Sequence, residues 1–105
     1  MKFFTREKPD DTDYSKLSLR EIVSVVKKDW KGLSEKKNNY ANELLEDIET
    51  LKTIGDNYYE DSGVRIVVGF LDEAKSWTTY TAQKVKKELA RRINEQNKKL
   101  QSKNI

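Results

Sequence analysis

The stretch Val64-Arg-Ile-Val-Val-Gly-Phe-Leu71 decides the fold class of this 105-residue chain. Its three consecutive β-branched residues favour a buried strand. Helical spacing of the apolar positions favours a helix instead, and a lone strand would lack partners. The helically spaced positions are Val64, Val67, Val68, Leu71 and Ala74. We therefore predict a helix over 63–76, in which Gly69 allows close approach by a neighbouring helix.

Upstream of this stretch, two further helices are predicted. Ser18 and Glu21 form the S-x-x-E pattern of a capping box and open a helix over 19–31, which Gly32 would end in a left-handed conformation. Ser34 is the expected cap of a second helix over 35–54. The connection between these helices is short, so they should be antiparallel neighbours.

Downstream, Thr78 is the expected cap of a last helix over 79–97. The sequence thus predicts an all-α fold, a small four-helix domain built from two consecutive helical hairpins. Residues 1–16 are expected to be an irregular lead-in, 17–97 a single helical domain, and 98–105 a frayed basic tail. The expected shared core is Ile22, Val26, Leu44, Ile48, Leu51, Val67, Leu71, Val85 and Leu89.

Composition narrows the possible chemistry. The chain has no cysteine and no histidine, which excludes disulfides, thiolate nucleophiles and imidazole acid–base catalysis. It shows no phosphate-binding glycine motif and no nucleophile motif. We expect a protein that is not an enzyme, has no cofactor, metal site or small-molecule substrate, and is cytoplasmic, because no apolar run would span a membrane.

Charge is distributed unevenly. Residues 84–103 carry eight basic and two acidic residues, a net charge of +6, whereas the whole chain is +3 and residues 1–83 must therefore sum to −3. On a helix, part of this charge forms one face, a candidate surface for nucleic acid or another acidic partner. Its residues are Lys84, Lys87, Arg91 and Lys98.

An alternative is that this face is simply solvated. Glu88 has Lys84 and Arg92 four residues away on either side, and such spacing suits ion pairs along a helix. Lysine also outnumbers arginine sixteen to five, whereas base-edge recognition relies on arginine. The acidic residues 43–49 of the second helix are expected to face outward, where they could receive the basic helix from the same chain or from another copy.

Aromatic residues mark a candidate protein interface. Trp30, Tyr58, Tyr59 and Trp77 lie near the ends of helices or in the loop at 56–63, where they either pack on the core or anchor a partner. The first hypothesis is thus a non-enzymatic helical module for protein–protein interaction or self-association. The second is a nucleic-acid-binding accessory protein that uses the basic C-terminal helix.

Overall fold

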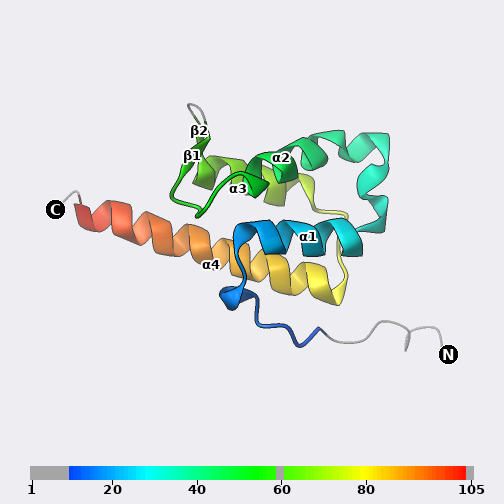
Figure 1. The fold of residues 1–105 in the computed structure, drawn as a ribbon, viewed down its shortest axis with the longest axis horizontal. Helices are drawn as coiled ribbons and strands as arrows, with labels where there is room; N and C mark the ends of the chain where they lie inside the picture. The colour runs from blue at the N-terminus through cyan, green and yellow to red at the C-terminus, as the bar shows by residue number, and fades with distance from the viewer. Residues whose placement is uncertain (1–9, 59–60, 104–105) are drawn as a thin grey trace.

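The computed structural model describes residues 10–58 and 61–103, and it is a small all-α domain with four α-helices in that part of the chain (Figure 1). The helices are α1 (Leu19–Asp29), α2 (Asn39–Glu49), α3 (Gly63–Glu73) and α4 (Tyr80–Lys103). Three short 3-10 helices are η2 (Tyr14–Lys16), η3 (Lys31–Ser34) and η4 (Lys36–Asn38). Two antiparallel two-residue strands, β1 (Asn57–Tyr58) and β2 (Asp61–Ser62), precede α3.

The stretch 64–71, which decides the fold class, is helical as predicted. The hydroxyl of Ser62 accepts a hydrogen bond from the amide of Arg65 (3.1 Å) and caps α3. The face that α3 buries differs from the expected one, because Ile66 and Phe70 are buried whereas Val68 is 42% exposed. A Cβ atom at Gly69 would lie 3.5 Å from the side chain of Leu44 in α2, an ordinary contact distance, so the helices do not approach closely enough there to require glycine.

The start of α1 is confirmed in detail, and its end is not. Ser18 and Glu21 form the reciprocal capping box, with an amide donating to each side chain (2.8 and 3.1 Å). The helix ends at Asp29, and Trp30 follows in an extended conformation. Gly32 does not have a left-handed φ and lies inside η3, so the predicted glycine-based ending is wrong.

The second helix is shorter than predicted. Ser34 lies in η3 and does not cap α2, whose N-cap position is taken by Asn38. The amide group of Asn38 is buried and donates to the carbonyl of Gly32 (2.8 Å), which stabilises the two 3-10 turns before the helix. The other end of α2 is Glu49 and not residue 54.

The last helix begins one residue later than its predicted cap implied and runs further. The hydroxyl of Thr79, not that of Thr78, accepts a hydrogen bond from the amide of Ala82 (3.0 Å) and caps α4. The helix continues to Lys103, beyond the predicted end at 97. Its last turns extend past the other helices in Figure 1.

The helices share one core, but the predicted arrangement into two consecutive hairpins is not confirmed. The most extensive interhelical contact joins α2 to α3, while α2 also packs on α1, and α4 packs on α1 and α3. Of the nine predicted core residues only Leu71 is not fully buried. Part of the expected lead-in also belongs to the folded body, because Tyr14 is buried in this core.

Gly63 is needed for the entry into α3. A Cβ atom at this position would lie 2.6 Å from the carbonyl oxygen of Ile54 and 2.8 Å from that of Asp56. The amide of Gly63 donates to the same Asp56 carbonyl (2.7 Å). The loop after α2 is therefore held against the start of α3 by a contact that leaves no room for a side chain.

Candidate functional site

The predicted basic surface follows α4, but its four residues have different surroundings. The ammonium group of Lys84 donates to the backbone carbonyl of Asp10 (2.7 Å). Arg91 is bonded to Glu88 and stays about half exposed, its side chain retaining 51% of its accessible surface. Lys87 and Lys98 are exposed and form no hydrogen bond or ion pair within the described residues. The face is thus only partly available to a partner.

Glu88 is the centre of the internal charge pairing. Its carboxylate is buried and accepts two hydrogen bonds from Arg91 (2.9 and 2.8 Å) and one from Arg92 (2.6 Å). The hydrogen bonds from Arg91, ahead of the opposing effect of burial, hold the pKa of Glu88 below its usual value. The predicted pairing of Glu88 with Arg92 is confirmed, whereas the predicted pairing with Lys84 is replaced by the bond from Lys84 to Asp10.

Arg92 connects α4 to the segment before α1. The same guanidinium that donates to Glu88 also donates to the carbonyls of Tyr14 (2.9 Å) and Leu17 (2.6 Å). These acceptors lie more than 70 residues away in the sequence, so the charge of Arg92 is used to dock the segment around η2 onto α4. It is not presented to a partner as a free cation.

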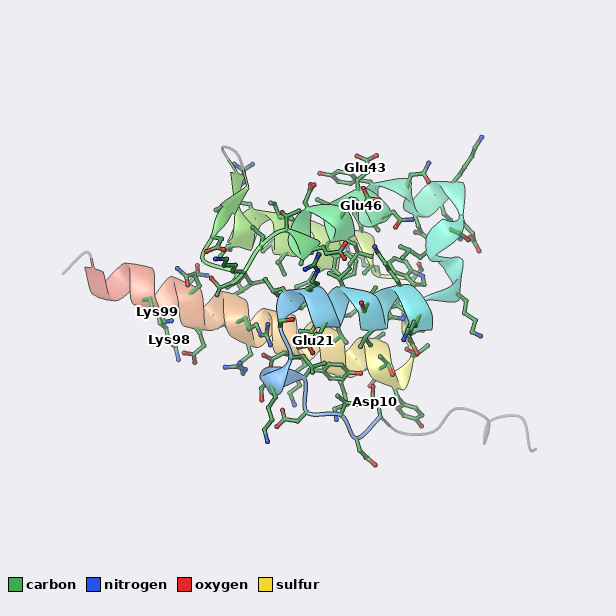
Figure 2. The ribbon with its side chains drawn as sticks, viewed as in Figure 1. Asp10, Glu21, Glu43, Glu46, Lys98 and Lys99 are labelled. Carbon is green, nitrogen blue, oxygen red and sulfur yellow. The ribbon has the colours of Figure 1, made fainter. Side chains whose placement is uncertain are left out.

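Asp10 forms a second connection between the same two segments (Figure 2). Its carboxylate accepts hydrogen bonds from the hydroxyls of Tyr14 and Thr81, the latter at 2.7 Å. Burial raises its pKa, but the hydrogen bonds from Tyr14, Thr12 and Thr81 outweigh burial and lower the pKa far below the ordinary value. Burial and the adjacent Asp10 raise the pKa of Tyr14 to about 12.

Two grooves lie along α4, and Arg91 lines both of them. The first groove, of about 470 Å³, is lined by both signs of charge, with Asp11 and Asp13 on the segment facing Lys84, Lys87 and Arg91 on the helix. Hydrogen bonds from the side chain and backbone of Ser15 are the main cause of the lowered pKa of Asp13, and Lys16 and then Lys84 lower it further. In this groove the three acidic side chains, Asp11, Asp13 and Glu88, thus equal the three basic ones in number.

The second groove, also about 470 Å³, is cationic. It lies between the start of α1, the loop after α2 and the second half of α4. Four of its side chains are cationic and one is anionic. These are Lys52, Arg91, Arg92 and Lys99, with Glu95 as the acidic member. We call this the cationic groove, and its net positive charge persists even though Glu88 offsets one of the two arginines.

Lys52 is brought to the cationic groove by a well-held loop. Leu51 and Ile54, on either side of it in the sequence, are buried in the core. The carboxylate of Asp56 accepts a hydrogen bond from the amide of Lys52 (2.9 Å) and so fixes the turn. The side chain of Gln96 in α4 lies against Gly55, where a Cβ atom would be 2.9 Å from its Oε1. The loop and the helix thus form two touching walls.

The aromatic residues predicted as an interface are largely internal. The rings of Trp30 and Trp77 are buried and stacked, with centroids 5.7 Å apart and planes 11° from parallel. Asp29 accepts hydrogen bonds from the indole nitrogen of Trp77 (2.9 Å) and from Thr79 (2.5 Å). The two tryptophans therefore pack in the core and offer no exposed anchor. Tyr59 and the side chain of Tyr58 lie outside the described residues.

Large apolar side chains are exposed at another place. Tyr40 on α2 is 55% exposed, and Val68 on α3 is 42% exposed. A shallow hollow of about 170 Å³ between these helices is lined by Tyr40, Leu44, Ile66 and Gly69 and by the charged residues Glu43, Asp47 and Arg65. Sequence reasoning did not find this face, because Tyr40 and Val68 both fitted apolar stripes that were expected to be buried.

The acidic face of α2 does not receive α4 from the same chain. Glu49 lies near Lys27 (3.6 Å) and Arg20 (4.0 Å) of α1. Glu43 and Glu46 point away from α4 in Figure 2, whereas Lys98 and Lys99 lie on its protruding part. Glu49 at the end of α2 is thus paired with α1 and not with α4.

No protein-family model, curated protein or solved structure matches this chain. Among the described helices, none combines the length and the apolar character needed to cross a bilayer.

Sequence reasoning found Arg91 of the cationic groove as a site residue but missed Lys52, which is 39 positions earlier. No local pattern signals that residue. The basic run at 84–103 identified one wall of the groove, and only the tertiary fold supplies the other wall.

Proposed function

We propose that this protein is a non-enzymatic accessory module that binds nucleic acid through the cationic groove. The observation that carries the proposal is the convergence of Lys52, from the loop after α2, with Arg91 and Lys99 of α4 in one open groove. Cationic side chains from two segments, held by buried neighbours, suit a phosphate backbone better than a row of independently solvated lysines. Lys98, exposed on α4, would add a further contact.

The composition of the groove favours contacts with phosphates over contacts with bases. Two of its cations are lysines, and the guanidinium groups of Arg91 and Arg92 are already bonded to Glu88. Sequence readout relies on arginines that are free to make bidentate contacts with guanine. We therefore expect binding that depends strongly on salt and weakly on sequence.

The ionisable groups with shifted pKa values support the proposal that the protein is not an enzyme. Asp10, Tyr14 and Glu88 have shifted pKa values, and each of them is bonded to a neighbouring segment or helix turn. Their hydrogen bonds join α4 to the segment before α1. Such groups can mark catalytic sites, but structural ion-pair networks produce the same shifts.

The test is fluorescence anisotropy with a labelled DNA duplex and a labelled RNA duplex at ~50 mM salt, where phosphate contacts are strong. The variant Lys52→Gln/Lys99→Gln should bind more weakly, and the slope of log K against log salt should fall by about 0.9 per lost contact. Its matched control is Lys28→Gln/Lys75→Gln, which removes the same charge from exposed lysines near the far ends of α1 and α3.

Absence of binding at low salt by the unmodified protein would overturn the proposal. So would an equal loss of affinity in both variants, because this would show a response to net charge alone. Binding of an acidic protein with no binding of either duplex would reassign the groove to a protein partner.

A second candidate function is self-association through the face between α2 and α3. Tyr40 and Val68 are exposed on adjacent helices, Tyr40 beside a shallow hollow that also holds Glu43, Asp47 and Arg65, and exposed apolar side chains are common at interfaces. Sedimentation velocity over a concentration series should show a dimer that the variant Tyr40→Ser/Val68→Ser abolishes. A strict monomer at all concentrations would exclude this function.

A further inference from the structure

The acidic segment Asp10–Asp13 lies along the first half of α4, over part of the predicted basic surface. It contains three carboxylates in four residues. The side chain of Asp10 is bonded to Thr81 at 2.7 Å, and its carbonyl accepts from Lys84, also at 2.7 Å. Asp11 and Asp13 line the same groove as Lys87 and Arg91. The segment thus occupies the position that an acidic ligand of this helix face would take.

We infer that the acidic segment takes the place of a phosphate backbone within the same chain. It thereby keeps nucleic acid away from the Lys84–Lys87 part of the surface, which we call the latent surface. This inference rests on the proposed function of the cationic groove and adds a means of regulating it. The active surface would be the cationic groove, and the latent surface would be the helix face that the chain itself neutralises.

The two surfaces are continuous, because Arg91 lines both grooves. A nucleic acid bound in the cationic groove can therefore extend along α4 towards Lys87 and Lys84 once the facing carboxylates are removed. With these carboxylates in place, the extension would bring phosphates within a few ångströms of Asp11 and Asp13. Like charges at such distances repel each other, even at physiological salt.

The attachment of the segment is uneven along its length. Tyr14 is buried in the core and Arg92 donates to the carbonyls of Tyr14 and Leu17, so the residues directly after the segment are firmly docked. Asp11 and Asp13 are exposed, and the hydrogen bonds of Asp13 go to Ser15 within the segment. The two exposed carboxylates can therefore be neutralised without disturbing the core.

The decisive variant is Asp11→Asn/Asp13→Asn, which removes two negative charges and leaves an amide oxygen at position 13 to accept from Ser15. Its matched control is Glu43→Gln/Asp47→Asn, with the same change in net charge on α2. Both are compared with the unmodified protein by anisotropy of a labelled DNA duplex over a salt series. Circular dichroism shows whether each variant retains its helices.

We expect the segment variant to bind more tightly than the control, and the slope of log K against log salt to steepen by about 0.9 for each lysine that gains a phosphate. If the unmodified protein binds but the two variants behave alike, the latent surface is overturned and the proposed function stands. If neither the unmodified protein nor the segment variant binds at ~50 mM salt, the proposed function itself fails.

Discussion

The two halves of α4 use similar residues for opposite purposes. In the first half, 80–92, Ala82, Val85 and Leu89 are buried, and Lys84 and Arg92 bind the segment before α1. In the second half, 93–103, Ile93 is only partly buried, and Lys98 and Lys99 are exposed. A basic residue on this helix is thus a structural connector or a potential ligand contact according to what packs against it.

The largest difference between the halves should appear in amide hydrogen exchange. Amides in the last turn of the first half, around Leu89, should exchange only on global unfolding, because the buried side chains there must leave the core. Amides near Lys99 can open by local fraying. For a domain with a free energy of unfolding of about 5 kcal/mol or more, protection should differ by about 1000-fold. Equal protection along α4 would mean that the second half is packed against a partner.

A smaller difference should appear when the two glutamates of the helix are compared. Glu88→Gln leaves the guanidinium of Arg92 without its carboxylate partner, and we expect a loss of about 2 to 3 kcal/mol in the free energy of unfolding. Glu95→Gln, in the exposed half, should change it by less than about 0.5 kcal/mol. Urea unfolding of both variants measures the contrast, and similar losses would contradict the assigned roles.

The smallest expected effect is the pH dependence of the stability, which arises from ionisable groups in the first half of α4 and in the segment docked on it. Because the pKa values of Asp10 and Glu88 are lowered in the folded state, their contribution is fully present above the unfolded values of 3.8 and 4.5 and is lost as pH falls below them. The pKa of Tyr14 is raised from 10.0 to about 12, so its contribution is lost as pH rises between these values.

The matching variant is Tyr14→Phe, which should cost about 1 kcal/mol near neutral pH and remove the alkaline loss. Thermal unfolding across the pH range measures both the loss of stability at low pH and the loss at high pH. Because the chain has no histidine, the stability should be nearly constant around neutral pH. A steep change there would contradict this account of the ionisable groups.

The sequence predicted the fold class because helix signals are local. The capping box at Ser18 and Glu21, and the apolar spacing after Gly63, depend on residues within a few turns of each other. The start of α2 could not be predicted in the same way. It depends on Asn38, whose side chain reaches back to the carbonyl of Gly32 and stabilises 3-10 turns where an α-helix was expected.

Only part of the candidate site could be predicted, again because sequence signals are local. The helical spacing of the basic residues placed Lys87 and Lys98 correctly on the exposed surface. The pairing of Lys84 with Asp10, and the arrival of Lys52 beside Lys99, join parts of the chain 74 and 47 positions apart. Charge patterns identify which residues are cationic, but only tertiary packing determines which of those cations remain available.

The stacked pair of Trp30 and Trp77 has a practical consequence. These are the two tryptophans of the chain, so all indole fluorescence originates from a single contact between the end of α1 and the approach to α4. Two indoles stacked at this separation couple their strong electronic transitions and should produce a paired signal in far-ultraviolet circular dichroism. The protein therefore carries an intrinsic optical reporter of the packing between the end of α1 and the approach to α4.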